Sequence, residues 1–387
     1  MKSRVKGDFH ARFCGKVKAK FLCLTRLWAI TRHQSKLEDM ILSITALLFA
    51  FTIAFGRQTA VIGKVKIALW FFSNFETKRI IFTIISLAFG ILSLLQNENS
   101  TGLNWLFIIT ILLILFSFFF DMKYFFPEVN KLEKNKPVNI SPQLQVIGVK
   151  IENICVAYPL NEVVIPRHII NDRINENSIL ISYCALCQSA LAFKSKIDNK
   201  DLYFKVAGVW RRNMIIYDTE TFSLWQQATG ECIYGKKKGQ QLELISGENT
   251  TLEEWKNKHP ETLFATKCTE ARKGYFSRES MLKMLNKVTP KVLMPGYSDL
   301  SELPARETVF GVNYNGISTA YPMLEVLGMN KFEDKYNGKL ITLYYNSDAN
   351  YLTAYETETL KELIVEKQWW LGWKEFHPET IIWKKSI

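Results

Sequence analysis

Three long stretches near the start of the chain contain no charged residue, and they limit its possible folds more than any other feature. They cover residues 40–56, 80–96 and 103–120. One helix needs roughly 17 to 25 mostly apolar residues to cross a bilayer. The sequence therefore predicts transmembrane helices at these places. They would form an anchor over residues 38–120 in the lipid bilayer of an inner or plasma membrane, followed by a soluble region.

The segment ahead of the first stretch is strongly basic. Residues 1–37 hold ten Lys and Arg residues against one acid, Asp8, and so carry nine of the chain's twelve net positive charges. Such a segment can bind nucleic acid or an anionic membrane surface. Because it directly precedes a membrane helix, we interpret it as a cytoplasmic tail that sets the topology, and we expect no nucleic-acid partner.

The side of the membrane on which the soluble region lies depends on the number of spans. Three spans place it outside the cytoplasm, but five basic residues would then lie in an external loop, against the usual bias: Arg57, Lys64, Lys66, Lys78 and Arg79. A short or re-entrant fourth segment over residues 65–76 would instead return the rest of the chain to the cytoplasm. Both topologies stay open on this evidence.

The soluble region is rich in short β-type runs. After a polar linker at residues 121–145, strands are predicted at 146–151, 179–183, 191–193, 202–206, 214–217 and 341–345. Helices are predicted mainly at 251–258 and 277–287. The expected fold class is α+β, with N-terminal transmembrane helices followed by a mainly antiparallel, β-rich soluble domain that contains an internal two-fold repeat.

The repeat is visible in two pairs of segments. VIGVKIENICVAYPLNEV at 146–163 matches VFGVNYNGISTAYPMLEV at 309–326, and EEWKNKHPETLF at 253–264 matches LGWKEFHPETII at 371–382. We therefore divide the soluble region into a first half at 146–270 and a second, degenerate half at 271–387. Motifs present in both halves are interpreted as scaffold, so any activity is expected in the first half.

A Cys-x-x-Cys motif in the first half carries the main chemical signal. Cys184 and Cys187 stand at a spacing that can grip one metal ion or form a disulfide. A site for Zn or Cu would add His168 as third ligand, Cys232 or Met214 as a weaker fourth, and Asn171 and Asp172 in support. Two alternatives stay open: a thiol–disulfide redox pair, and two small core residues beside a structural histidine.

A non-enzymatic interpretation uses polar and aromatic residues downstream of the motif. In a membrane-tethered ligand-binding or scaffold module they would line a pocket for a small or anionic ligand: Trp210, Arg211, Arg212, Tyr217, Asp218, Trp225 and Gln227. The run YDTET at 217–221 is equally a good turn sequence. Nucleotide-binding, zinc-protease and hydrolase signatures are absent from the sequence, which therefore assigns neither a reaction nor a substrate.

Several motifs in order resemble a bacterial family known as domain of unknown function 3179. They are AYPL (157–160), HIIND (168–172), SYCALCQSALAF (182–193), MIIYDTETFSLWQQATGECIYG (214–235) and a closing W-x-x-x-HPET. The resemblance implies an exported or membrane-attached protein, which favours the extracytoplasmic side, and it implies no activity. Ala185 and Gln188 replace the Pro and Gly of the family's turn, where Gly would allow a positive φ.

Overall fold

The computed structural model describes residues 37–56, 66–96, 101–120, 132–160, 167–245, 247–267, 280, 283 and 300–385. The chain divides into two compact units, residues 1–56 with 76–119 and residues 57–75 with 120–387. The basic tail and nearly all of the helix predicted at 277–287 lie outside the described residues.

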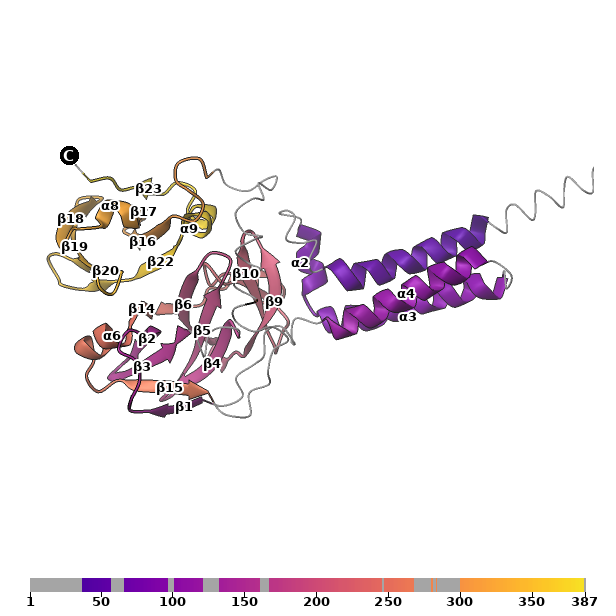
Figure 1. The fold of residues 1–387 in the computed structure, drawn as a ribbon, viewed down its shortest axis with the longest axis horizontal. Coiled ribbons are helices and arrows are strands. Elements are labelled where there is room, and N and C mark those ends of the chain that lie inside the picture. The colour runs from indigo at the N-terminus through magenta and orange to yellow at the C-terminus, as the bar shows by residue number, and fades with distance from the viewer. Residues whose placement is uncertain are drawn as a thin grey trace, which may run out of the picture. The chain divides into compact units, whose positions relative to one another are not determined.

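The first unit consists of apolar helices (Figure 1). They are Leu37–Gly56, α3 (Phe75–Gln96) and α4 (Thr101–Phe119), and all three are long and apolar enough to cross a membrane. Small polar side chains join them, as membrane helices commonly use. Ser43 Oγ lies 2.7 Å from Ser93 Oγ, and Ser86 Oγ donates to the carbonyl oxygen of Ala46 at 2.7 Å. These helices coincide with the three predicted spans.

The first half of the β-rich unit contains three four- or five-stranded sheets. One has the order β1 (Leu132–Asn135), β15 (Leu263–Lys267), β3 (Ile154–Pro159), β2 (Gln145–Ile151), β14 (Gly247–Thr251). The next is β13 (Leu244–Ile245), β6 (Ser189–Lys194), β5 (Asn177–Cys184), β4 (Ile169–Ile174). The third is β12 (Cys232–Tyr234), β11 (Leu224–Gln226), β10 (Asn213–Asp218), β9 (Phe204–Trp210). A small pair, β7 (Lys196–Ile197) and β8 (Lys200–Asp201), and helix α6 (Leu252–Lys258) complete it.

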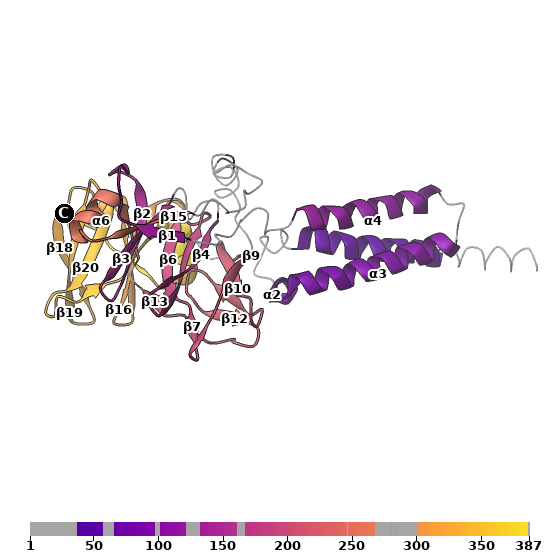
Figure 2. The ribbon, with the colours of Figure 1, turned by 90° about the horizontal axis from the view of Figure 1, so that it is seen from below.

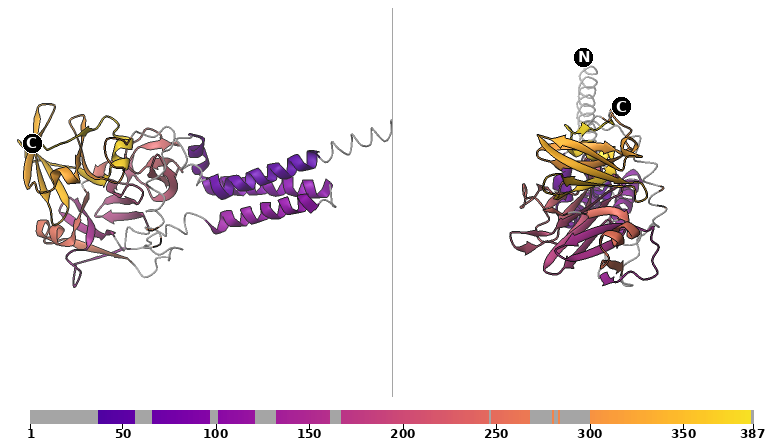
Figure 3. Two further views of the ribbon diagram at one scale, coloured as in Figure 1. Left: turned by 45° about the horizontal axis from the view of Figure 1, so that its top comes forward. Right: turned by 90° about the vertical axis from the view of Figure 1, so that its left-hand side faces the viewer.

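Over residues 300–385, the second half forms two sheets and two short helices. The sheets are β22 (Val365–Trp369), β16 (Thr308–Tyr314), β17 (Ile317–Pro322), β23 (Ile381–Ile382), and β18 (Lys331–Tyr336), β19 (Lys339–Asn346), β20 (Tyr351–Glu356), β21 (Glu362–Leu363). The helices are α8 (Met323–Val326) and α9 (Trp370–Phe376). Within the β-rich unit, β18 to β20 and β9 to β12 lie at opposite ends (Figure 2), and the yellow second half lies against the first (Figure 3).

The two halves share strand order and pairing direction. The order β14-β2-β3-β15 corresponds to β22-β16-β17-β23, with two antiparallel pairs and then a parallel one in each. The order β13-β6-β5-β4 likewise corresponds to β21-β20-β19-β18. The sheet β9 to β12 is inserted between β6 and β13, and the described part of the second half has no sheet at the matching place.

A tryptophan holds the matching helix of each half against its sheet. Trp255 Nε1 donates to Thr262 Oγ1 at 2.7 Å, and Trp373 Nε1 donates to Thr380 Oγ1 at 2.8 Å. Each indole ring lies on a glycine of the central strand, because a Cβ at Gly148 or Gly311 would come within 2.3 Å or 2.1 Å of the ring. The segments that match in sequence therefore make matching contacts.

Strand β5 is buried on both of its faces, which explains its apolar sequence. Ile179, Ile181 and Tyr183 belong to a core with β2 and β3. Leu180 and Cys184 point the other way, into a core that also contains residues of β10 to β12. Because side chains alternate along a strand, this places Cys184 on the side of the inserted sheet.

Helix α2 (Lys66–Phe72) belongs to the β-rich unit, although it precedes α3 in sequence. Leu69 and Phe72 are buried in one cluster with Ala207 and Trp210 of β9. Its seven residues, in the segment for which a fourth span was considered, are far fewer than a bilayer crossing needs.

The predicted α+β class and most predicted strands are confirmed. The strand expected at 202–206 instead runs over Phe204–Trp210 as β9. Part of the segment predicted as a linker forms β1, an edge strand that pairs antiparallel with β15. Its sequence, LEKN, contains no apolar run, because none of its side chains is fully buried at this edge of the sheet. The hydrophobic pattern of the sequence therefore did not predict a strand here.

Candidate functional site

The Cys-x-x-Cys motif forms the tight turn between β5 and β6. Cys184 ends β5, Ser189 begins β6, and Gln188 between them has a φ of 57°. The Tyr183 hydroxyl donates to Gln188 Oε1 at 2.7 Å, and Gln188 Nε2 donates to the Ala185 carbonyl oxygen at 3.2 Å. These bonds allow a non-glycine residue to occupy the left-handed region, so the turn forms without the family's glycine.

Hydrogen-bonding groups surround the sulfur of Cys187. Asn213 Nδ2 donates to Sγ at 3.2 Å, and Ser189 Oγ lies 3.2 Å from it. Burial acts to raise the pKa of this thiol, but hydrogen bonds from Cys184, Ser189 and Asn213 lower it to about 7. Burial and the neighbouring Cys187 raise the pKa of Cys184 well above its ordinary value. The two thiols therefore differ strongly in acidity.

A buried amide network holds these donors in place. Gln227 Oε1 accepts from Asn213 Nδ2 at 2.8 Å and from Ser189 Oγ at 3.1 Å. Gln227 Nε2 donates to Ser182 Oγ at 3.2 Å, and Gln226 Nε2 donates to Asn213 Oδ1 at 2.9 Å. The Ser189 hydroxyl has one hydrogen and can donate it either to Gln227 Oε1 or to the Cys187 sulfur. It can therefore donate to the sulfur when the thiol is ionised.

The second half covers the turn with β22 and α9, and we call this contact the first junction. The Trp369 amide donates to the Cys187 carbonyl oxygen at 2.8 Å. A Cβ at Gly372 would lie 2.5 Å from Cys187 Cβ and 2.7 Å from Gln368 Oε1, so only glycine fits there without movement. Cys184 and Cys187 are 2% and 0% exposed, so the junction closes both thiols off from solvent.

One acidic side chain of β22 lies near the sulfur. Burial and the charge of Cys187 raise the pKa of Glu366 to about 8. Gln368 Nε2 donates to Glu366 Oε2 at 3.2 Å. Among the described residues, the buried Gln368 Oε1 has no hydrogen-bond donor. A carboxyl group with a raised pKa and an amide of the second half thus face the thiol turn of the first half.

An ion pair fastens α9 to the first half. Arg211 Nε donates to Glu375 Oε1 at 3.0 Å, and Arg211 Nη2 donates to the Glu375 carbonyl oxygen at 2.9 Å. Arg212 Nη1 lies 3.8 Å from Glu375 Oε2. The Glu375 side chain is 0% exposed, so these two arginines of the β9–β10 turn neutralise a buried charge.

The predicted third metal ligand makes different contacts. His168 Nδ1 lies 2.7 Å from the Tyr183 carbonyl oxygen, and its ring stacks on Tyr183 with centroids 5.9 Å apart. Burial lowers the pKa of His168 to about 4, so the imidazole is neutral near pH 7. Across the described ranges, no three His, Cys, Asp or Glu side chains are grouped to hold a metal ion, and the predicted metal site is not confirmed.

Two residues proposed to support that metal site join strands. Asp172 accepts from the Tyr158 hydroxyl at 2.7 Å and from Lys134 Nζ at 2.7 Å. Asn171 Nδ2 donates to the Phe204 carbonyl oxygen at 2.9 Å, and its Oδ1 accepts from the Phe204 amide at 2.8 Å. Asn171 therefore ties β4 to β9, and Asp172 has a matching partner in Asp334, which accepts from Tyr321 at 2.7 Å.

The downstream aromatic segment is a braced turn. Asp218 accepts from the Thr221 amide at 2.6 Å and from Trp225 Nε1 at 2.9 Å, and both Asp218 and Trp225 are 0% exposed. Tyr217 stacks on Phe222 with centroids 6.1 Å apart. Of the predicted pocket residues, Gln227 alone has a described hydrogen bond within the network around Cys187.

Cys232 and Met214 lie in the same buried cluster as the two motif cysteines. Cys232 Sγ donates to the Tyr234 carbonyl oxygen at 3.5 Å. Burial raises the pKa of this thiol to about 12, so it stays protonated near pH 7. Both residues therefore contribute packing.

The comparison with protein families agrees with the motifs. A family model described as protein of unknown function (DUF3179) matches residues 124–360. The chain belongs to this family. No curated protein and no solved structure matches the chain.

The DUF3179 match extends beyond the first half, which the motifs alone had covered. It includes both cysteines, Asn213 and Gln227, and continues through β18 to β20 of the second half. It ends before Glu366, Gln368 and Gly372, which complete the first junction.

Sequence reasoning missed most of the residues around the sulfurs. Ser182 and Ser189 flank the motif and could have been noticed by proximity. Asn213 begins β10, after the turn of Arg211 and Arg212, and no motif of its own marks it. Glu366 could have been found from the match between the halves. It pairs with Gly311 on the neighbouring strand, just as Glu248 pairs with Gly148 in the first half.

Proposed function

We propose that the β-rich unit is a membrane-anchored thiol–disulfide redox protein, in which Cys187 is the attacking thiolate and Cys184 the resolving thiol. One observation carries the proposal: a buried sulfur receives a hydrogen bond from Asn213 and has Ser189 Oγ at 3.2 Å, where a core cysteine needs neither. Donors aimed at a thiol stabilise its anion, which is the reactive form.

The reaction balances as a two-step exchange. The Cys187 thiolate attacks one sulfur of a substrate disulfide, the bond between the substrate sulfurs breaks, and one of them leaves as a thiolate that takes up a proton. Cys184 then gives its proton to solvent and attacks the Cys187 sulfur, which releases the second substrate thiolate. The substrate gains two electrons, and the protein retains a Cys184–Cys187 disulfide.

A substrate must displace the cover of the first junction before it can react. The contacts to be broken are the hydrogen bond from the Trp369 amide to Cys187 and the ion pair between Arg211 and Glu375. The junction thus protects the thiols in the closed state, and its opening controls the rate of exchange.

We infer that the β-rich unit lies on the extracytoplasmic side, where disulfides persist. Helix α2, between the first two membrane helices in sequence, packs on β9, so three spans put this loop and the β-rich unit on the same side. The basic tail then lies on the other side, which the positive-inside bias favours. Arg79 adds little external charge, because it is buried, pairs with Glu76, and donates to the Ser117 carbonyl oxygen at 3.0 Å.

The decisive experiment is a redox titration of the full-length protein in detergent. Native protein is equilibrated with glutathione buffers, and the cysteines are then trapped with a maleimide that shifts gel mobility. The working background replaces the other five cysteines, so that only Cys184 and Cys187 report: Cys14, Cys23, Cys155, Cys232 and Cys268.

A two-electron transition with a potential between about −270 and −120 mV supports the proposal, because known oxidoreductases fall in this range. The double variant Cys184→Ser/Cys187→Ser is the blank. If Cys184 and Cys187 stay reduced in the folded protein at every redox potential of the glutathione buffer, the redox proposal is wrong.

Loosening the first junction should speed the exchange. We expect Glu375→Gln to raise the rate at which Cys187 reacts with a small disulfide by about tenfold or more, because one partner of a buried ion pair is removed. Glu379→Gln, an exposed change just beyond α9, is the matched control. Equal rates in both variants would show that α9 does not limit access.

A thiophilic metal at the two sulfurs is the alternative we retain. Two adjacent thiolates are suitable ligands for Cu(I) and, with further ligands such as His168, for Zn(II). Metal content per chain, measured on anaerobically purified protein and on the double serine variant, tests it. A full equivalent of metal that is lost in the variant would favour the metal site over the redox pair.

A further inference from the structure

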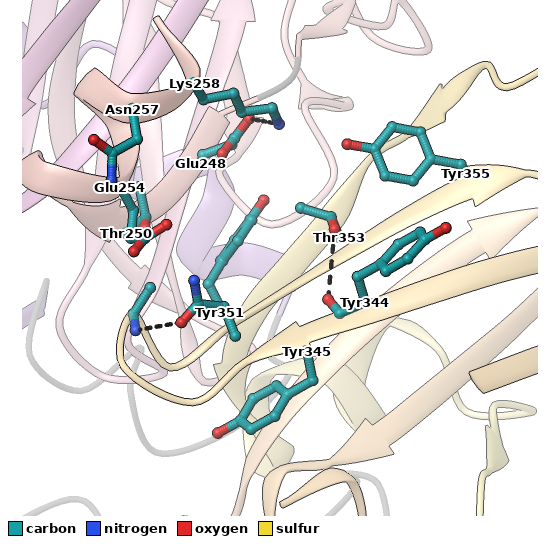
Figure 4. A pocket seen from close by; sticks show the side chains of 12 residues that line it. Glu248, Thr250, Glu254, Asn257, Lys258, Tyr344, Tyr345, Tyr351, Thr353 and Tyr355 are labelled. Atoms are coloured by element: carbon teal, nitrogen blue, oxygen red, sulfur yellow. Dashed lines mark hydrogen bonds and ion pairs between the residues drawn. The ribbon is translucent and has the colours of Figure 1, made fainter. Parts of the chain in front are cut away.

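A second junction between the halves encloses a pocket. Here the turn at residues 347–350 and its strands β19 and β20 face β14 and α6, and the space between them has a volume of about 310 Å³ (Figure 4). This volume is at the lower end for small-molecule sites. The residues that line this pocket take no part in the hydrogen bonds described above for the thiol site.

Tyrosine rings form one wall of this pocket. Tyr344 and Tyr355 lie diagonally across β19 and β20, with ring centroids 6.0 Å apart and an interplanar angle of 73°. Tyr344 as a residue is 42% exposed, so part of its side chain is open to a ligand. Figure 4 shows Tyr351 rising between this wall and the side chains of β14 and α6. An aromatic wall of this kind offers the negative faces of its rings.

Acidic groups predominate on the opposite wall. Lys258 Nζ bonds both Glu248 Oε1 at 2.5 Å and Glu362 Oε1 at 2.7 Å, so one ammonium group serves two carboxylates. Glu254 of α6 adds a third carboxylate, for which the described residues provide no cation. Burial, followed by the charges of Glu248 and Glu362, raises the pKa of Tyr351 well above its ordinary value. On this side of the pocket, three carboxylates therefore share one ammonium group.

We propose that this pocket binds a small organic cation, an amine or quaternary ammonium compound, with its charged group against the rings of Tyr344 and Tyr355, in a pocket that the carboxylate of Glu254 also lines. A cation is attracted to the faces of such rings, and a nearby carboxylate adds to the attraction. Lys331 already places its Nζ 5.7 Å from the centroid of the Tyr344 ring, so this ring attracts a cation within the chain itself.

The corresponding positions at the first junction explain why space remains at the second. By the shared strand order, Ala349 occupies the place of Cys187, and Glu254 occupies that of Gly372. At the first junction the glycine lets the two surfaces touch. At the second junction, the turn carries the small residue Ala349 and the helix carries the carboxylate of Glu254. A cavity remains between them, and both residues line it.

Calorimetric titration of the full-length protein tests the proposal. The detergent must contain neither choline nor sugar groups, and ionic strength is kept constant because charge attraction is screened by salt. The probes are choline and ethanolamine, with 3,3-dimethyl-1-butanol as the uncharged isostere of choline and glucose as a neutral polyol.

We expect choline or ethanolamine to saturate in the millimolar range or below, and to bind about fivefold or more tightly than the isostere. Tyr344→Leu and Glu254→Gln should each weaken binding by about five- to tenfold. Glu253→Gln, on the exposed face of the same helix, is the matched control and should leave the affinity unchanged.

Three results would overturn the assignment. They are no saturation by either cation up to about 50 mM, equal affinity for the uncharged isostere, and saturation by glucose in place of both cations. Tyr344 is well exposed and Glu254 lies at the pocket surface, so both variants are expected to fold. Their melting curves confirm this before titration. The redox titration of Cys184 and Cys187 is a separate measurement, so failure here leaves that proposal standing.

Discussion

The tips of the β5–β6 and β19–β20 hairpins have the same backbone but different side chains. Gln188 and Asn350 both have a positive φ, of 57° and 47°. Each accepts a hydrogen bond from a tyrosine hydroxyl at the end of the preceding strand, at 2.7 and 3.2 Å. The conformation of the turn therefore does not depend on the cysteines.

The difference between the tips lies in what fills them. In the second half, Asn346 Oδ1 accepts hydrogen bonds from the amides of Asp348 and Ala349 at 2.9 and 3.0 Å. A side chain of the turn thus pairs with the backbone amides of the same turn. In the first half, the corresponding place holds a thiol pair, and the inserted sheet β9 to β12 supplies Asn213 and Gln227 beside it. One scaffold thus carries a self-contained turn in one half and a chemically equipped turn in the other.

The largest expected effect tests whether the two scaffolds are equivalent. Gly148→Ala and Gly311→Ala each push a Cβ into an indole ring, that of Trp255 or Trp373. We expect each substitution to lower the free energy of unfolding by about 3 kcal/mol, and to lower the melting temperature by roughly 6 to 12 °C. Tryptophan fluorescence on heating measures this.

Gly102→Ala, where a Cβ would meet nothing within 4 Å, is the control for these variants. A large loss in only one of the two glycine variants would show that the halves are not packed alike.

A smaller effect separates the histidines that follow α6 and α9. Burial lowers the pKa of His377 from 6.5 to about 4. Between these pH values the unfolded chain binds a proton that the folded chain does not, so stability falls as pH drops from about 6.5 to 4. His377→Gln should remove about 2 to 3 kcal/mol of this loss, seen as a melting temperature less sensitive to acid.

His259 provides the comparison in the first half. Burial and then the charges of Lys258 and Lys150 lower its pKa as well, by less than at His377. His259→Gln should therefore flatten the acid dependence less. If the two variants have the same pH profile, burial at the end of α9 is not the cause.

The smallest expected effect concerns the inserted sheet. Asn213→Ala removes a donor to Cys187 Sγ, so the pKa of this thiol should rise from about 7 by roughly one pH unit, or about 1.4 kcal/mol. Thiolate absorbance, corrected with Cys187→Ser, follows the titration. Asn257→Ala at the second junction should leave the midpoint unchanged. An unshifted midpoint in Asn213→Ala would mean that the hydrogen bond does not stabilise the anion.

The sequence predicted those features that depend on contiguous residues. Uncharged runs of sufficient length marked the three helices that could cross a membrane, and short apolar β-type runs marked β2, β5 and β10. The segments 146–163 and 309–326, which match in sequence, form the antiparallel pairs β2–β3 and β16–β17. Thr251 before two acids marked the start of α6, where its side chain accepts from the Glu254 amide.

The site itself could be predicted only in part, because its groups meet through tertiary packing. Asn213 reaches Cys187 because two separate sheets share the core around Leu180. Gly372 and Glu366 come from the second half of the soluble region, whereas the sequence analysis expected any activity in the first half. Conversely, His168 and Asp172 stand near the cysteines in sequence, yet local backbone and side-chain partners use their polar atoms.

The membership of α2 in the β-rich unit has a consequence for biosynthesis. The ribosome completes α2 long before β9 and β10, the strands that bury Leu69 and Phe72. At about 5 to 20 residues per second, this apolar helix waits roughly 7 to 30 s for its binding surface. During that interval Leu69 and Phe72 lack the surface that buries them in the finished fold, so α2 can take its final place only after most of the first half has been made.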